Sequence, residues 1–173
     1  MIALAEAADR PDCPYEVVLV AANDPEAPGL ARARMMGLPT WGEHHRGKTR
    51  EAFDRAIDAE LDARRVEVVA LAGYMRLLSP WFVEKWAGRV LNIHPSLLPR
   101  YKGLDTHARA IAAGDAEAGV SVHVVTAELD DGPVIAQARV QVLPGDTPDT
   151  LAARVLVEEH LLYPRALAEF VTR

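Results

Sequence analysis

The sequence predicts a three-layer α/β fold, in which helices cover both faces of a mainly parallel sheet. Predicted strands alternate with predicted helices along most of the 173 residues, which is the order that βαβ units produce. The first strands are near-continuous apolar runs, as expected where both faces of a parallel sheet are covered. Half of the residues are hydrophobic (50%) and a quarter are charged (25%), so the chain can form one globular domain with a substantial core.

The first half of the chain contains three predicted helices and three predicted strands. Alanine and leucine dominate the first helical stretch, Gly37 is suited to end the second, and Thr49 is suited to cap the third. Runs of valine, alanine and leucine that end at turn residues mark the strands. The predicted helices are 2–8, 29–36 and 50–65, and the predicted strands are 15–22, 38–41 and 66–73.

The second half adds a central strand, an antiparallel strand pair and a long final helix. Ser79 with Pro80 and Thr147 with Pro148 each predict a helix start, because a capping hydroxyl precedes a first-turn proline. The short linker between the last two strands favours an antiparallel pair. The predicted helices run from 80 to Gly88, from 106 to 113, and from 148 to about 171 with a kink at Pro164, and the predicted strands are 90–94, 119–125 and 134–140.

Composition narrows the classes of function and of compartment. The formal net charge of -6 argues against a nucleic-acid-binding protein, and no stretch approaches the roughly 20 apolar residues of a membrane span. Cys13 is the only cysteine, so neither an internal disulfide nor a cysteine-rich zinc site is expected. His44 and His45 lie in a polar loop with no third ligand nearby, which favours a solvated loop over a metal site. We therefore expect a cytoplasmic protein that acts on small molecules.

The central strand at 90–94 aims two polar side chains at one place. Asn92 and His94 are two residues apart, so they share a face of the strand and lie about 6.6 Å apart along it. Pro95 ends the strand and puts His94 at the carboxyl edge of the sheet, where ligands bind in open α/β sheets. A catalytic pair and a pair of hydrogen-bonded core residues both fit this spacing.

A second candidate feature is the linker between the last two strands. Asp130 and Asp131 precede Gly132, and ordinary turns also show this pattern because aspartate side chains accept hydrogen bonds from nearby amides. Arg100 and Lys102, in the loop after the central strand, fit either an anion site or ordinary surface charges. The residues alone leave both interpretations open.

Three motifs together resemble the phosphoribosylglycinamide formyltransferase family, within the folate-dependent formyltransferases. They are residues 92–99 (NIHPSLLP) followed by 101–103 (YKG), residues 130–137 (DDGPVIAQ) and residues 72–80 (AGYMRLLSP), with Glu158-Glu159-His160 in support. The resemblance implies a single formyltransferase domain over residues 1–173 with a Rossmann-like fold.

The resemblance also implies an activity. Members of this family transfer a formyl group from 10-formyltetrahydrofolate to the amine of glycinamide ribonucleotide (5′-phosphoribosylglycinamide) in de novo purine biosynthesis. The expected partners are therefore these small molecules, with no nucleic acid, membrane or metal cofactor. The expected oligomeric state is a monomer or a homodimer.

Asn92, His94 and Asp130 can perform this chemistry. An amine that attacks a formyl group produces a tetrahedral centre with an oxyanion, which needs hydrogen-bond donors. Asn92 and a protonated His94 would be those donors. Asp130 would keep His94 protonated above its ordinary pKa of about 6.5 and would receive the proton of the amine. A zinc site made of His94, His107, His123 and Asp130 is conceivable by residue type, but their spacing does not support it.

The resemblance further assigns substrate-binding residues. The predicted folate-binding residues are Arg50, Met75, Arg76, Leu77, Leu78, Asn92, Thr126, Ala127, Glu128, Leu129 and Asp130. Their backbone is expected to hold the pterin-like ring. The predicted ribonucleotide-binding residues are Leu156, Val157, Glu158 and Glu159. Of these, Glu159 is expected to contact the substrate, whereas Leu156 and Val157 are expected to pack.

The resemblance departs at the N-terminus. The family carries a first strand and a phosphate-binding loop that leads into a helix, and Met1 matches the family just after that loop. We expect the natural protein to start upstream and this chain to lack both features. Two alternatives are a formyltetrahydrofolate hydrolase, in which water replaces the amine, and a catalytically silent folate-binding module. Residues 94–99 (HPSLLP) favour the glycinamide enzyme, as does the absence of the extra domains of the hydrolases and of methionyl-tRNA formyltransferases.

Overall fold

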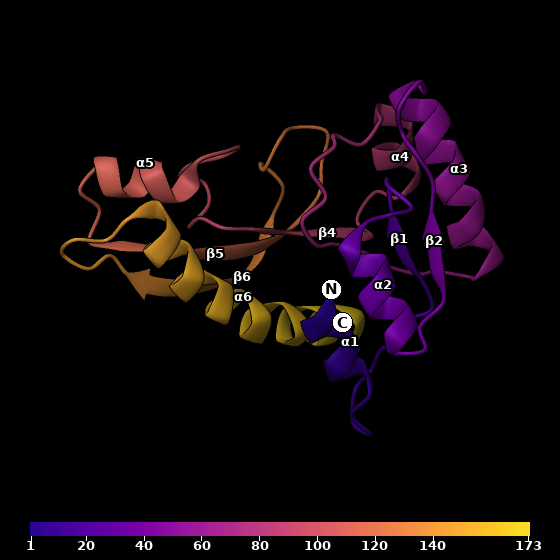
Figure 1. Ribbon diagram of the computed structural model, residues 1–173, viewed down its shortest axis with the longest axis horizontal. Helices are drawn as coiled ribbons and strands as arrows, with labels where there is room; N and C mark the ends of the chain where they lie inside the picture. The colour runs from indigo at the N-terminus through magenta and orange to yellow at the C-terminus, as the bar shows by residue number, and fades with distance from the viewer.

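Six helices and six strands follow one another in the order that the sequence predicts (Figure 1). A computed structural model describes all residues from Met1 to Arg173. The helices are α1 (Ile2–Ala8), α2 (Pro28–Met35), α3 (Arg50–Ala63), α4 (Pro80–Lys85), α5 (Thr106–Ala112) and α6 (Pro148–Val171). The strands are β1 (Val20–Ala22), β2 (Thr40–Gly42), β3 (Val69–Leu71), β4 (Val90–His94), β5 (Glu117–Val124) and β6 (Val134–Gln141).

The strands form two separate hydrogen-bonded sheets. β3, β4, β5 and β6 are neighbours in that order, with β3 parallel to β4 and with antiparallel pairing from β4 to β6. β1 and β2 form a second, parallel pair without ladder bonds to the first sheet. Parallel strands combined with a C-terminal antiparallel pair confirm the predicted α/β class.

β1 and β3 differ from the prediction in length and in burial. Each has only 3 residues, whereas the apolar runs predicted strands over 15–22 and 66–73. Their residues are half-buried and not covered on both faces as expected. Each strand is hydrogen-bonded to one neighbouring strand only, so its other edge has no ladder partner. The apolar runs therefore mark the right places but overestimate the regular strand.

β4 separates two hydrophobic clusters because its side chains alternate between faces. Leu91 belongs to the larger cluster, which also contains Leu151 and Val155 of α6. Val90 belongs to a smaller cluster that contains Trp86, the residue directly after α4. Helices thus cover both faces of β4, which gives the three layers that the sequence predicts.

Local capping sets where three of the helices begin. The hydroxyls of Thr49, Ser79 and Thr147 each accept a hydrogen bond from the backbone amide three residues later, at 3.1, 3.3 and 3.2 Å. α4 ends at Lys85, earlier than the predicted stop at Gly88, and α6 continues through Pro164. None of the helices combines the length and the apolar character that a membrane span requires.

Candidate active site

One face of β4 and β5 turns polar toward the carboxyl end of β4. Asn92 lies directly opposite His123, and His94 lies directly opposite Ser121. The intervening Ile93 packs against the cluster that α6 covers, on the other face of the sheet. The register of two antiparallel strands therefore brings these polar side chains together from distant parts of the sequence.

Asn92 and His123 share a hydrogen bond across the ladder. Nδ2 of Asn92 lies 3.2 Å from Nε2 of His123, and Nδ1 of His123 lies 3.2 Å from the carbonyl oxygen of Val124. Because a carbonyl oxygen only accepts, the ring proton of neutral His123 belongs on Nδ1, which leaves Nε2 to accept from the amide. Burial lowers the pKa of His123 and so favours this neutral ring.

His94 is held between two oxygen atoms. Its Nε2 lies 2.9 Å from the carbonyl oxygen of Tyr101, and its Nδ1 lies 3.4 Å from Oδ2 of Asp130. Only 8% of each of the His94 and Asp130 side chains is exposed. Because a carbonyl oxygen only accepts, Nε2 carries a proton and donates it to Tyr101, while Nδ1 faces the carboxylate of Asp130.

A tight turn carries Asp130 to the two histidines. Asp130 has a φ of 49°, in the left-handed region that aspartate tolerates better than most residues. Its Oδ2 accepts the backbone N–H of Gly103 at 2.9 Å, and its Oδ1 lies 3.5 Å from Nε2 of His123. At Gly132 a Cβ atom would lie 1.8 Å from the Val124 carbonyl oxygen, so only glycine fits this close to β5. We call Asn92, His94, His123 and Asp130 the polar cluster.

Comparison with known proteins shows the family of the chain. A family model described as formyl transferase matches residues 2–167. The chain belongs to the formyl transferase family. Its fold is that of a solved relative, phosphoribosylglycinamide formyltransferase from Brucella melitensis, with a TM-score of 0.92 and 51% identity over 97% of this chain and 87% of that chain. The Rossmann-like formyltransferase fold that the motifs imply is thereby confirmed.

Two sequence relatives of this formyl transferase differ greatly in length. Phosphoribosylglycinamide formyltransferase of Escherichia coli (strain K12) is 51% identical over 152 residues, which cover 87% of this chain and 72% of that protein. The trifunctional purine biosynthetic protein adenosine-3 of Homo sapiens is 42% identical over 166 residues. That match covers 95% of this chain but only 16% of the human protein.

In this formyl transferase the predicted folate segment at residues 75–78 is a loop that follows β3. Met75 and Leu77 are exposed, whereas Arg76 and Leu78 are half-buried. The guanidinium of Arg76 lies 5.3 Å from the centre of the Phe53 ring of α3. No backbone amide or carbonyl of residues 75–78 is hydrogen-bonded to another backbone group. A ligand can therefore bind to these groups.

A second exposed loop leads from β5 to the turn at Asp130. It contains the predicted folate residues Thr126, Ala127, Glu128 and Leu129, all of which are exposed. Their backbone groups also lack hydrogen bonds to other backbone groups. Two loops with the same property thus follow two strands of one sheet.

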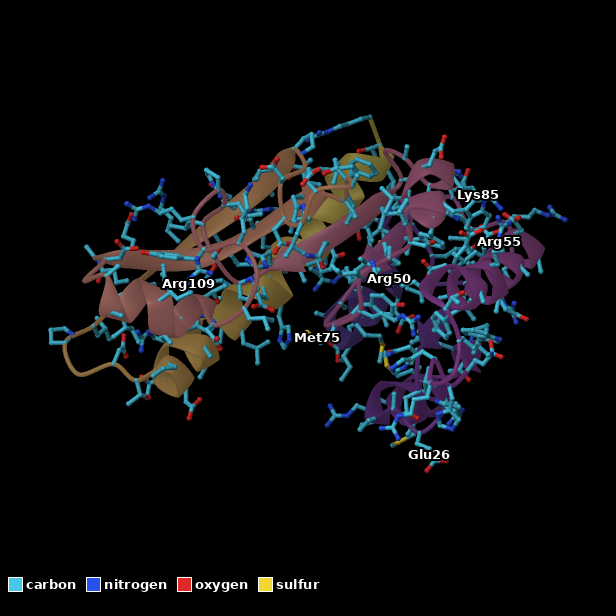
Figure 2. The ribbon with its side chains drawn as sticks, turned by 90° about the horizontal axis from the view of Figure 1, so that it is seen from above. Glu26, Arg50, Arg55, Met75, Lys85 and Arg109 are labelled. Carbon is cyan, nitrogen blue, oxygen red and sulfur yellow. The ribbon has the colours of Figure 1, made fainter.

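Arg50 is the remaining predicted folate residue, and it is the exposed first residue of α3. Figure 2 shows Arg50 and Met75 in the middle of the molecule, between the part that holds α5 and α6 and the part that holds α2 and α3. No hydrogen bond or ion pair of the Arg50 side chain links it to the polar cluster. The role of Arg50 in folate binding stays a prediction.

The predicted ribonucleotide residues lie on α6, which covers the opposite face of β4 from the polar cluster. Leu156 and Val157 are 47% and 59% exposed, so the expectation that they pack in the core is wrong. The helical phase directs Val155 into the core instead. Glu158 and Glu159 are half-buried, and burial raises the pKa of Glu159. A ribonucleotide-binding role for these residues stays a prediction.

Sequence reasoning missed several groups around the polar cluster. The Tyr101 carbonyl and the Gly103 amide are backbone groups, and backbone groups leave no signal in residue types. His123 entered only as a ligand in the zinc alternative, although its place in the predicted strand at 119–125 marks it as a buried polar residue. The structure contains no group of three or more His, Cys, Asp or Glu side chains arranged to hold a metal ion.

Proposed function

We propose that the chain transfers the formyl group of 10-formyltetrahydrofolate to the amine of 5′-phosphoribosylglycinamide, a step of de novo purine biosynthesis. One observation carries this proposal: an amide, an imidazole between two oxygens and a buried carboxylate lie within reach of one another. The E. coli and Brucella relatives bear the name of this reaction, which supports the choice of acceptor.

The polar cluster matches the negative charge that develops during formyl transfer. Attack of the amine on the formyl carbon moves charge onto the formyl oxygen, where N–H donors stabilise it. Asn92 has a second amide proton besides the one that faces His123, and an imidazolium at His94 is a further donor. Nε2–H of His94 donates to the Tyr101 carbonyl in this structure. During the reaction it would donate to the oxyanion instead, which carries more negative charge and is therefore the stronger acceptor.

Asp130 is suited to the proton transfer. The amine loses a proton as its bond to the formyl carbon forms, and the folate nitrogen N10 gains a proton as its bond to that carbon breaks. The carboxylate of Asp130 can accept the amine's proton directly or through one water molecule. The Gly103 N–H, which donates to its Oδ2 at 2.9 Å, orients this carboxylate, and the same oxygen lies 3.4 Å from Nδ1 of His94.

The two exposed loops fit the folate. A pteridine ring carries hydrogen-bond donors and acceptors along its edge, and backbone amides and carbonyls without backbone partners match such an edge. Met75 and Leu77 are 79% and 53% exposed and add apolar surface for a flat ring. When bound, the folate supplies the formyl group at N10. This match supports the assignment of residues 75–78 and 126–129 to the folate site.

The experiment that tests this function is a formyl-transfer assay with the purified chain, 10-formyltetrahydrofolate and 5′-phosphoribosylglycinamide, with chromatographic detection of the formylated ribonucleotide. We expect product only when both substrates are present. A parallel reaction without acceptor measures released formate. Formate release that does not need the acceptor would indicate a hydrolase, and folate binding without any turnover would indicate a silent binding module. Either result would contradict the proposal.

A further inference from the structure

Asp54 of α3 is a carboxylate without exposed surface and lies outside the polar cluster. Its relative exposure is 0%, and its Oδ2 accepts the backbone N–H of Ser79 at 2.5 Å. Its Oδ1 is buried and has no hydrogen-bond partner. A buried carboxylate oxygen without a donor lowers the stability of a fold. Stability alone therefore does not explain an acidic residue at this position. Residues that lower the stability of a fold in this way are concentrated at functional sites.

The N–H that Asp54 holds belongs to the peptide unit joining Leu78 to Ser79, at the end of the predicted folate segment. This contact is not the cap of α4, because the Ser79 hydroxyl already accepts the N–H of Phe82 at 3.3 Å. The carboxylate of Asp54 instead fixes the last peptide of the loop that exposes its backbone between residues 75 and 78.

A second residue of α3 contacts the loop. Burial raises the pKa of Tyr74, the residue that precedes the segment, to about 12, and the negative charge of Asp54 contributes to this rise. Arg76, within the segment, packs over the ring of Phe53, the neighbour of Asp54 on α3. α3 therefore contacts the loop at Arg76 and at its last peptide.

Asp58, one turn further along α3, is a buried carboxylate with a structural role only, and it serves as a comparison for Asp54. Its Oδ1 accepts Nε1–H of Trp86 at 2.8 Å, and its Oδ2 accepts from Nζ of Lys85 at 2.6 Å. Both oxygens are used, and both partners lie at the far end of α4 from Ser79. The two acids thus hold opposite ends of α4, and only Asp54 contacts the folate segment.

We propose that Asp54 is a positioning residue for the folate donor: its hydrogen bond to the Ser79 amide sets the backbone of residues 75–78 in the conformation that receives the pteridine ring. The inference rests on the proposed function, because it takes this loop to be part of the folate site. It adds a residue that contacts no substrate yet determines how tightly the formyl donor binds.

The decisive variants are Asp54→Leu and Asp54→Asn, with Asp58→Leu as the matched control. Leucine removes the acceptor for the Ser79 N–H, whereas asparagine keeps an acceptor oxygen in nearly the same place. We expect Asp54→Leu to raise the KM for 10-formyltetrahydrofolate by about 10-fold or more, since small misplacements of binding groups have effects of up to about 100-fold. The KM for the ribonucleotide should stay within about twofold, and Asp54→Asn should restore most of the folate KM.

The control separates positioning from general loss of stability. Asp58→Leu should lower the Tm while leaving the folate KM close to that of the parent chain. Should Asp54→Leu not fold, Asp54→Ala and Asp58→Ala replace the leucine pair in the same assays. Equal folate KM values for the Asp54 and Asp58 variants, or equal increases in both KM values, would overturn the proposal.

A second measurement does not depend on the reaction. Amide hydrogen exchange in the folate-free protein should be faster at Ser79 in Asp54→Leu than in the parent chain and in Asp58→Leu, because the Ser79 N–H donates to Asp54. A parent chain without formyl transfer would disprove the proposed function, whereas unchanged exchange at this amide would disprove the role of Asp54. The two failures are thereby distinguishable.

Discussion

The amide nitrogen of Asn92 lies 3.2 Å from Nε2 of His123, its direct partner across the β4–β5 ladder. Only the neutral ring with its proton on Nδ1 can accept this hydrogen bond while donating to the Val124 carbonyl. His123 therefore selects one of the two orientations of the Asn92 amide. The side-chain oxygen and the second N–H of Asn92 are aimed by a residue that sequence reasoning did not place in the site.

Replacing His123 by leucine should impair catalysis through Asn92. The substitution keeps the burial but removes the acceptor, so the amide is free to rotate away from the developing oxyanion. We expect kcat to fall by about 10-fold, which corresponds to about 1.4 kcal/mol of transition-state stabilisation. Steady-state kinetics would test this, with His160→Leu at an exposed position of α6 as control. A His123→Leu variant with the kcat of the parent would show that the orientation of Asn92 does not depend on His123.

The lowered pKa of His123 predicts how the free energy of unfolding depends on pH. Its pKa is lowered in the fold, chiefly by burial, so between that pKa and the ordinary value of about 6.5 the unfolded chain binds the proton and the folded chain does not. The free energy of unfolding should therefore be fully retained above about pH 6.5 and should decrease as the pH falls below it. His107, whose pKa burial also lowers, adds to the same trend.

Urea unfolding at pH 7.5 and pH 5.5 measures this dependence. Carboxylates titrate in the parent and in the variant alike, so the comparison with His123→Gln isolates the contribution of one ring. The loss of stability between the two pH values should be smaller in the variant. An equal or larger loss would mean that His123 does not bind a proton on unfolding.

Asp130→Asn should nearly abolish turnover while leaving the turn in place. Asparagine can still accept the Gly103 N–H, but it removes the charge beside His94 and the acceptor of the amine's proton. We expect kcat to fall by about 100- to 10,000-fold, the usual range for loss of an acid–base group. His94→Ala should have an effect in the same range, and the double variant should lose little more, because the two residues act as a unit. Circular dichroism should show a folded protein in each case, and near-normal turnover of either single variant would refute its assigned role.

Gly132→Ala tests whether the turn positions Asp130. The added Cβ would lie 1.8 Å from the Val124 carbonyl oxygen, so the turn must move away from β5. We expect lower stability together with lower kcat, measured by thermal unfolding and by the transfer assay. Gly29→Ala is the control, since nothing lies within 4 Å of its Cβ and α2 should tolerate or prefer alanine. If kcat is unchanged in a folded Gly132→Ala protein, the close approach of the turn is unimportant for catalysis.

Local signals account for what the sequence predicted well. Thr49 and Thr147 each cap a helix at the predicted residue, and Pro95 ends β4 directly after His94. These features depend on neighbouring residues only, so residue type and spacing are sufficient to find them. Asn92 and His94 share a face for the same reason, because side chains alternate along a strand.

Features that depend on distant residues were not predictable in this way. The length of β1 is set by its hydrogen bonds to β2, which cover only 3 residue pairs, although the apolar run is longer. The contact between Asn92 and His123 depends on the register of two strands that are separated along the chain by a loop and α5. Leu156 has the apolar character of a core residue, yet the rotation of α6 exposes it.

β4 has a consequence for laboratory evolution of this chain. Leu91 and Ile93 pack toward α6, whereas Asn92 and His94 lie on the opposite face, in the polar cluster. One face of this short strand therefore contributes to stability and the other to the proposed reaction. A mutant library limited to Leu91, Ile93 and their partners on α6 would vary heat tolerance without sampling inactive polar clusters. Conversely, a library at the positions facing His123 would change reactivity while the packing against α6 stays as it is.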